Sequence, residues 1–164
     1  MQVMDCNIRI WHCMKKIFHI DLFRRLQGKK KGDGTMYRIA IVTDSEKKGR
    51  EYADRLLRFC KEMHVFPEIE TYGDQESFFK NLNHMRPTSV LIALSGVSGL
   101  NVAEHFRSVC PECGIIWCSD LDFSLQAFRL RIEYFFQEPI DEKTFSDGLA
   151  VWFFRRQMNA EREH

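Results

Sequence analysis

The sequence predicts an α/β fold in which a doubly wound, five-stranded parallel sheet is covered by five helices on both faces. Two observations carry this prediction. The runs at 37–42, 89–94 and 114–118 are apolar almost throughout and rich in β-branched residues, which is typical of strands buried on both faces. These runs and two further strand-like runs alternate with segments in which apolar residues recur at helical spacing, as in βαβ units.

Each element is predicted from its own pattern and its own boundary residues. Pro67 places the second strand at an edge of the sheet, because proline cannot donate a hydrogen bond to a neighbouring strand. Asp44 or Ser45 caps the first helix, Asp141 caps the last helix, and Pro87 ends the second. The predicted elements are strands at 37–42, 65–72, 89–94, 114–118 and 134–137, and helices at 44–63, 74–85, 100–109, 121–131 and 141–157.

Length and composition fit one globular domain with a single core. The chain has 164 residues, a net charge of +1, 45% hydrophobic residues and 29% charged residues, which excludes an intrinsically disordered protein. The small net charge gives no whole-chain electrostatic reason for nucleic-acid binding. No apolar run is long enough to span a membrane, and Asp5, Arg9 and Lys15 interrupt the region where a secretory signal would lie. We therefore expect a cytoplasmic protein.

Six cysteines are scattered along the chain, and we interpret them as reduced thiols. Cys110 and Cys113 have the spacing of a metal-ligand pair, but the sequence holds no second pair and its six histidines are dispersed. A redox pair of this spacing would open a helix, whereas this pair precedes an apolar strand. We therefore predict a plain loop at 110–113, no metal site and no cofactor.

Charge divides the chain into unlike parts. Residues 1–35 carry eight basic residues against three acids, a net charge of +5 that leaves −4 for the remainder. A glycine- and lysine-rich linker at 28–34 separates this basic extension from a globular domain predicted at 36–158, which a short tail follows at 159–164.

Three interpretations of the extension are open. Residues 8–26 could form an amphipathic helix that lies on an anionic membrane surface, or the same helix could dock on a partner or on the folded domain. Alternatively, translation starts at Met36, because residues 31–33 can be encoded by a purine-rich stretch of the kind that binds bacterial ribosomes. The apolar residues at helical spacing are Trp11, Met14, Phe18, Leu22 and Leu26.

The predicted topology also points to a candidate site. In a doubly wound sheet the functional site lies at the carboxyl ends of the strands, near the point where the strand order reverses. The residues at these ends are Thr43 and Asp44 after the first strand, 93–99 after the third, Ser119 after the fourth and Glu138 after the fifth.

Several local patterns resemble the receiver domain of bacterial two-component response regulators, the CheY-like family. They are similar to the opening strand with its acidic residues, the loop before the third helix, the strand that ends in a hydroxyl, and the aromatic run before a proline. These patterns lie at residues 39–44, 97–100, 115–119 and 135–139. The resemblance covers about residues 36–158 and implies a flavodoxin-like sheet of strand order 2-1-3-4-5. Ala127 and Phe128 resemble receivers that precede LytTR-type DNA-binding domains.

The departures from the family bear on its chemistry. In the family, two acids after the first strand hold Mg²⁺, an aspartate at the end of the third strand accepts phosphate, and a lysine before the last proline neutralises it. Thr43 replaces one acid, Ala93 the aspartate and Glu138 the lysine. Ala93 offers no nucleophile, and Glu138 reverses the charge that attracts phosphate. Asp44 alone is a poor Mg²⁺ site. The resemblance therefore implies a degenerate pocket in a pseudo-receiver.

We expect a phosphorylation-independent signalling module that acts through protein–protein contacts and is not an enzyme. Ser119 keeps the switch hydroxyl of the family and Phe135 its switch aromatic residue. In the family, the face of the fourth helix, fifth strand and fifth helix contacts a partner or a second copy. Candidate residues on this face are Leu125, Phe128, Arg129, Phe135, Asp147, Trp152 and Arg155. The alternative is that Phe128, like Ala127, faces inward and that Trp152 belongs to the core.

Other function classes remain in view. The chain could be a fragment of a DNA-binding response regulator, although residues after 158 are too few for a DNA-binding domain and the folded domain itself is not expected to bind nucleic acid. It could also accept phosphate at a non-standard site, for which Ser95 and Ser98 are candidates, or sense a small molecule. For each serine the simpler interpretation is a turn residue.

Overall fold

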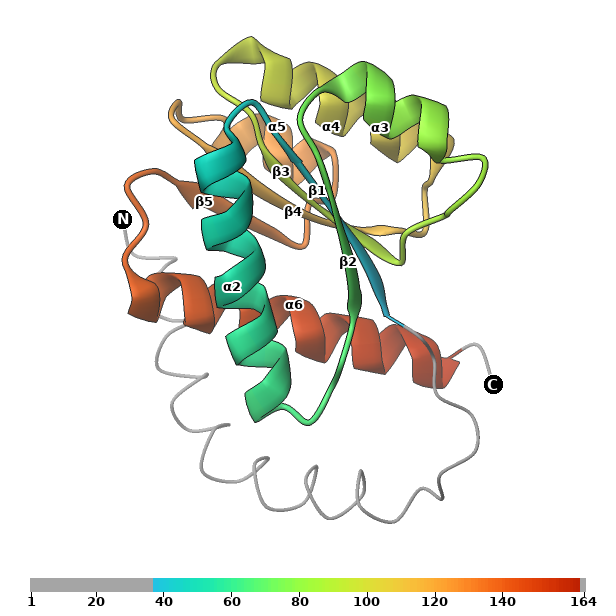
Figure 1. Cartoon of the computed structure of the whole chain (residues 1–164), viewed down its shortest axis with the longest axis vertical. Helices are drawn as coiled ribbons and strands as arrows, with labels where there is room; N and C mark the ends of the chain where they lie inside the picture. The colour runs from blue at the N-terminus through green and yellow to red at the C-terminus, as the bar shows by residue number, and fades with distance from the viewer. Residues whose placement is uncertain (1–36, 163–164) are drawn as a thin grey trace. The chain divides into compact units, whose positions relative to one another are not determined.

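Five parallel strands form a central sheet in the order β2-β1-β3-β4-β5 (Figure 1). The computed structural model describes residues 37–162 of the chain. Strands and helices alternate throughout this range, so the predicted doubly wound α/β fold and its strand order are confirmed. The elements are β1 (Arg38–Thr43), α2 (Glu46–Glu62), β2 (Glu68–Tyr72), α3 (Gln75–Asn81), β3 (Ser89–Ala93), α4 (Val97–Val109), β4 (Gly114–Ser119), α5 (Ser124–Arg129), β5 (Tyr134–Gln137) and α6 (Glu142–Arg162).

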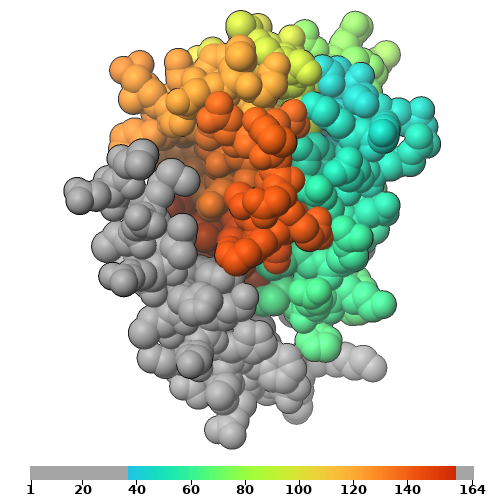
Figure 2. All heavy atoms as spheres, turned by 90° about the vertical axis from the view of Figure 1, so that its left-hand side faces the viewer, coloured from blue at the N-terminus to red at the C-terminus, as the bar shows by residue number. Residues whose placement is uncertain are grey.

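Helices cover both faces of the sheet. Side chains of α2 and α6 pack on one face, and those of α3, α4 and α5 pack on the other (Figure 1). Figure 2 faces the side of the molecule on which the first half of α6, in orange, lies against α2, in teal. Because β3 and β4 are buried along their whole length and β1 beyond its first residue, both faces of these strands must be apolar.

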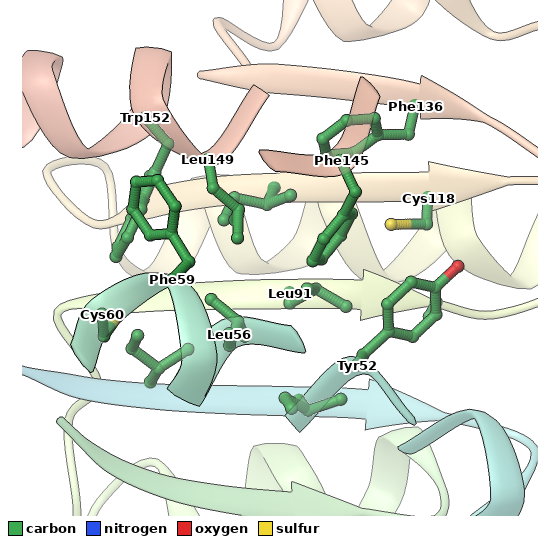
Figure 3. Packing of buried hydrophobic residues seen from close by; sticks show 14 of the residues in the cluster. Tyr52, Leu56, Phe59, Cys60, Leu91, Cys118, Phe136, Phe145, Leu149 and Trp152 are labelled. Carbon is green, nitrogen blue, oxygen red and sulfur yellow. The ribbon is translucent and has the colours of Figure 1, made fainter. Parts of the chain in front are cut away.

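The core between α2, α6 and the sheet is rich in aromatic residues (Figure 3). The rings of Phe136 and Phe145 lie 5.2 Å apart, and Tyr52 packs on Phe145 at 5.5 Å. Trp152 is only 1% exposed, and its indole N–H donates to the Ser89 hydroxyl over 3.0 Å. Trp152 is therefore a core residue, and its placement among the candidate contact residues is wrong.

Several element boundaries differ from the predicted ones for local reasons. Strand β2 begins only after Pro67, because the preceding residues close the end of α2. Helix α3 ends at Asn81, and hydrogen-bonded turns lead from there to Pro87. Helix α4 begins at Val97, three residues earlier than predicted, because Gly96 at φ +58° turns the chain directly into the helix. Helix α6 continues past 157 to Arg162.

Helix α5 is shorter than predicted and turns Phe128 outward. Ala127 is 4% exposed and faces the core as predicted, whereas Phe128 is 82% exposed. Neighbouring residues of a helix lie about 100° apart, and with Ala127 directed at the core Phe128 falls on the solvent side of this short helix. The helix ends at Arg129, and Arg131 adopts a left-handed φ of +53°. The prediction that Phe128 faces inward is therefore wrong.

Arg107 of α4 ties two turns together. Its guanidinium donates to the carbonyl oxygens of Pro111 and Cys113 over 2.7 and 2.8 Å, in the turn before β4. It also donates to the carbonyl oxygens of Leu130 and Arg131, both over 2.9 Å, in the turn before β5. The side chain is 17% exposed. The planar guanidinium of Arg107 therefore fixes two turns at the amino-terminal edge of the sheet relative to each other.

The predictions on the basic extension concern residues outside the described range, 37–162. The amphipathic helix at 8–26 and the start at Met36 fall outside the described residues. Within 37–162, no helix combines the length and the apolar character that crossing a membrane requires.

The close approach of α6 to β5 yields a stability prediction. A Cβ atom at Gly148 would lie 2.3 Å from the Phe136 ring and 2.7 Å from Tyr134, so a core ring must move in Gly148→Ala. We expect this variant to lose about 2 kcal/mol of unfolding free energy in urea titrations, because overpacking outweighs the better helix propensity of alanine. Gly73→Ala is the matched control, since a Cβ there meets nothing within 4 Å. Equal stability of the two variants would contradict the prediction.

Candidate functional site

The carboxyl end of β1 presents Thr43 and Asp44. Thr43 is fully buried, and its hydroxyl oxygen accepts a hydrogen bond from the Ser45 backbone N–H over 3.2 Å. Asp44 is exposed, and its carboxylate accepts the backbone N–H of Ser95 over 3.2 Å. Thr43 therefore shapes the turn into α2, whereas Asp44 reaches across to the loop that follows β3.

Two carboxylates hold the loop between β3 and α4. Ala93 ends β3 and is 1% exposed, so its methyl group is part of the core. After it, the backbone N–H of Ser95 donates to Asp44, and that of Gly96 donates to Asp120 over 2.8 Å. Two N–H groups of this loop that could otherwise face an anion, those of Ser95 and Gly96, are thus bonded to side chains of the chain itself.

Ser119 is buried at the end of β4. Its hydroxyl oxygen accepts the backbone N–H of Leu121 over 3.1 Å, and its carbonyl oxygen accepts the N–H of Glu138 over 2.8 Å. The hydroxyl therefore caps the turn after β4, which is the simple structural role of a serine at such a position.

Glu138 lies in a half-buried network with two residues of α2. Both of its carboxylate oxygens accept from the Lys48 ammonium group, over 2.9 and 3.2 Å, and Oε1 also accepts the Tyr52 hydroxyl over 2.9 Å. The side chains of Lys48 and Glu138 are 37% and 20% exposed. The hydrogen bond to Glu138 raises the pKa of Lys48, and the carboxylates of Asp44 and Asp120 raise it further.

Tyr52 connects this network to the core. Figure 3 shows its ring among the core side chains, with the hydroxyl extended toward the carboxyl ends of the strands. Burial raises the pKa of Tyr52, and the neighbouring Cys118 and Glu138 raise it further, so the hydroxyl stays protonated and donates. Burial likewise raises the pKa of the Cys118 thiol.

Lys48 and Tyr52 are absent from the predicted site, yet both bind Glu138, and Lys48 balances its charge. The expectation that Glu138 makes this edge repel phosphate takes no account of Lys48, which neutralises it. The signal for both residues is present in the sequence. Lys48 lies in the first turn of the helix that follows β1, and Tyr52 lies one turn further on the same side. A residue at such a position points toward the carboxyl edge of the sheet.

Phe135 belongs to an aromatic cluster on the other face of the sheet. Its half-buried ring packs edge-on against Trp117 at 5.2 Å, and Trp117 stacks on Phe123 at 5.3 Å. The Trp117 indole N–H has no hydrogen-bond partner among the described residues. A Cβ at Gly99 would lie 2.8 Å from the indole nitrogen, so only glycine allows α4 to approach this ring so closely.

The edge does not fit the Mg²⁺ ion that a receiver-type pocket implies. Magnesium prefers oxygen ligands in octahedral geometry, usually including carboxylates. Here the carboxylates of Asp44 and Asp120 accept backbone N–H groups, and Lys48 holds Glu138. Within residues 37–162, no three side chains of His, Cys, Asp or Glu are grouped to bind a metal ion.

The fold is the one that receiver domains of response regulators adopt. The response regulatory domain of protein mrkE from Klebsiella pneumoniae matches with a TM-score of 0.61 at 16% identity, over 74% of this chain and 98% of that one. A CheY-like receiver domain protein from Methanospirillum hungatei gives 0.59 at 16% identity, over 79% and 100%.

A longer protein shares the same fold. Response regulator DrrB of Thermotoga maritima, an OmpR/PhoB homolog, matches with a TM-score of 0.56 at 16% identity, over 74% of this chain. This chain spans 54% of the length of that protein. No family model and no curated protein matches the sequence. At these identities the structural matches define the fold alone.

The Lys48–Glu138 pair gives the second prediction. A double-mutant cycle of Lys48→Met and Glu138→Gln in urea unfolding should give a coupling of about 1 kcal/mol at pH 7, because the pair is only partly screened by water. The pKa of Lys48 is raised above its ordinary value of 10.5 in the folded protein. The coupling should therefore be complete between neutral pH and pH 10.5, where both groups are charged, and disappear as the pH rises through the raised pKa.

A fully exposed pair provides the control for this cycle. Arg50 and Glu46 lie 2.8 Å apart with side chains 71% and 84% exposed. We expect their coupling to stay below about 0.5 kcal/mol. A coupling at Lys48 and Glu138 no larger than that of this pair would count against the network.

Proposed function

We propose that the chain is a phosphorylation-independent, receiver-like signalling module that acts by binding another protein. It is not an enzyme in this proposal. It works in the cytoplasm, in two-component or transcriptional regulation of the kind that its receiver-type fold and its LytTR-like sequence features favour. The proposal rests on the carboxyl edge of the sheet, where a receiver would accept phosphate.

One observation carries the proposal: the groups at this edge that could hold a phosphoryl group are either missing or bonded within the chain. Ala93 stands at the end of β3 and has no nucleophilic atom. The Ser95 and Gly96 N–H groups of the β3–α4 loop are bonded to Asp44 and Asp120. Lys48 of α2, which could otherwise attract a phosphoryl group, is paired with Glu138.

A second consideration is the energy needed to open this arrangement. A phosphoryl group would have to displace the carboxylates of Asp44 and Asp120 from the N–H groups of the β3–α4 loop. It would also compete with Glu138 for Lys48, which would bring its negative charge close to that of Glu138. Like charges in a partly buried site repel one another more strongly than in water. The internal bonds therefore favour a single, phosphate-free state of the edge.

The third prediction concerns phosphorylation. Incubation of the protein with Mg²⁺ and acetyl phosphate should leave its intact mass unchanged, because Ala93 cannot form an acyl phosphate. The DrrB receiver domain of Thermotoga maritima, which is described in a BeF3-activated form, is the positive control under the same conditions.

A phosphoryl adduct on this chain would overturn the proposal. Ser95 lies in the loop after β3 and Ser98 in the first turn of α4, and both are exposed, so peptide mapping together with Ser95→Ala and Ser98→Ala would locate a replacement phosphosite. An adduct that one of these alanine variants abolishes and the other leaves intact would establish the phosphoacceptor alternative instead.

The proposed contact surface lies on α5 and the neighbouring part of α6. Leu125 and Phe128 are 58% and 82% exposed. Arg129 follows Phe128 directly and is exposed, as is Arg155 of α6. The Arg155 guanidinium donates to the Glu133 carbonyl oxygen over 3.1 Å, which places it at the turn between α5 and β5. We call Leu125, Phe128, Arg129 and Arg155 the α5 surface. Phe135 and Asp147 are half-buried and contribute less.

Charge indicates the kind of partner. Within residues 37–162, neither Arg129 nor Arg155 forms an ion pair with a carboxylate. Asp147, the one acid among the predicted contact residues, is bound to Lys143 over 2.8 Å. Two exposed guanidinium groups without a carboxylate partner, together with exposed apolar side chains, favour an acidic partner that carries apolar residues, since such a partner neutralises them while it covers Phe128. A second copy in a twofold arrangement would bring the arginines together.

The fourth prediction tests this surface with two helical peptides that share one apolar stripe, one rich in glutamate and the other rich in lysine. The glutamate-rich peptide should bind at least about tenfold more tightly in fluorescence anisotropy, and Phe128→Asp should weaken it by a similar factor. Leu57→Asp is the matched control, because Leu57 is 45% exposed but lies on α2.

Stability and oligomeric state complete this test. Phe128→Asp should change the unfolding free energy by less than about 0.5 kcal/mol, because the side chain is already exposed. Equal binding of the two peptides would contradict an acidic partner. A dimer in sedimentation velocity that Phe128→Asp dissociates would assign the surface to a second copy instead.

A further inference from the structure

The turn between α4 and β4 brings two cysteines together. Cys110 follows the last residue of α4 and Cys113 precedes the first residue of β4. The backbone N–H of Cys113 donates to the carbonyl oxygen of Cys110 over 3.2 Å, which closes a four-residue turn. The Cα atoms at the two ends of such a turn lie within about 7 Å of each other, which is the range that a disulfide bridges.

The two side chains also interact. The neighbouring Cys110 thiol contributes to the raised pKa of Cys113, both through its charge and as a hydrogen-bond partner. Cys110 is 5% exposed, whereas Cys113 is half-buried and open to solvent on one side. The Cys113 thiol donates to the Pro87 carbonyl oxygen over 3.2 Å. One thiol is therefore accessible to a reagent, and the second lies behind it.

The other described cysteines have no such arrangement. Cys60 and Cys118 are each 1% exposed and belong to the core on the α2 and α6 side of the sheet. Cys110 and Cys113 belong to the opposite core. Within residues 37–162, the turn therefore holds the pair of thiols best placed to react with each other.

We propose that Cys110 and Cys113 are a modification site, where a small-molecule disulfide such as glutathione disulfide converts the two thiols into a reversible intrachain disulfide. The Cys113 thiolate attacks one sulfur of the reagent, so that a mixed disulfide forms and one thiolate leaves. The Cys110 thiolate then attacks the Cys113 sulfur and releases the second thiolate. The two protons lost by the protein are taken up by the two leaving thiolates, so two electrons pass from the protein to the reagent.

Arg107 allows this reaction without a rearrangement of the backbone. Its guanidinium holds the carbonyl oxygens of Pro111 and Cys113 in place on both sides of the turn. Closure therefore requires that the Cys113 side chain leave the Pro87 carbonyl and rotate toward Cys110. The reduced form keeps that hydrogen bond, and the oxidised form exchanges it for a covalent bond.

Electrostatics sets the rate of the first step. Burial raises the pKa of Cys113 to about 11, and Cys110 raises it further, while Arg156 and Arg107 lower it. The thiolate is therefore a small fraction at neutral pH, and that fraction grows about tenfold for each pH unit below the pKa. The site should react slowly at pH 7 and much faster at pH 9.

The experiment uses the full chain with glutathione disulfide, followed by trapping of free thiols with N-ethylmaleimide and peptide mapping. We expect the peptide that contains 110–113 to lose two hydrogen atoms and to regain them with dithiothreitol. Its rate of formation should rise by about tenfold per pH unit between pH 7 and pH 9. Cys110→Ala and Cys113→Ser should each abolish the product, and the matched variant Cys60→Ala should leave it unchanged.

Three results would overturn the proposal. The first is a glutathione adduct that persists on Cys113 while Cys110 stays free. The second is a disulfide in the folded chain that involves cysteines other than this pair. The third is the absence of reaction at pH 9. Repetition in urea keeps the test valid if a variant folds poorly, because the yield of this disulfide relative to other pairs should fall when the turn is unfolded, although the short spacing still favours it.

Discussion

Burial of the central strands on both faces is the constraint on which the rest of this structure depends. Strands β3 and β4, and β1 beyond its first residue, expose almost no surface, so helices must cover the sheet on two sides. Parallel strands then require each connection to return along a helix, which brings every strand's carboxyl end to one edge. The polar residues of the candidate site meet there because the core leaves them no other place.

The same constraint explains how much could be predicted from the sequence. Continuous apolar runs such as that of β3 indicate buried parallel strands when they alternate with amphipathic segments. The sheet and its helices could therefore be predicted. The positions of Thr43, Ala93 and Ser119 at strand ends followed directly. Helix boundaries depended on single backbone conformations, such as the positive φ values of Gly96 and Arg131, which no periodic pattern encodes.

Side-chain partners were less predictable than positions. Glu138 was located by its place after β5, but its partner Lys48 lies 90 residues away along the chain. Such pairs form only if α2 packs on the same face of the sheet as the partner residue. The topology of the whole chain determines that face, and a local sequence pattern does not show it. Phe128 and Trp152 have similar helical spacing to core residues, yet one is 82% exposed and the other 1%. A short helix such as α5 has too few residues to define its buried face from periodicity alone.

The charges at positions 48 and 138 constrain how this sequence can change. A lysine at 138, as the receiver resemblance implies, would place two ammonium groups within about 3 Å of each other while Lys48 is present. An acid at 48 beside Glu138 would be equally unfavourable. The two positions can therefore exchange their charges only together, or through a neutral intermediate that leaves the Tyr52 hydroxyl with an uncharged acceptor. The ion pair therefore links the choice of residue at position 48 to the choice at position 138.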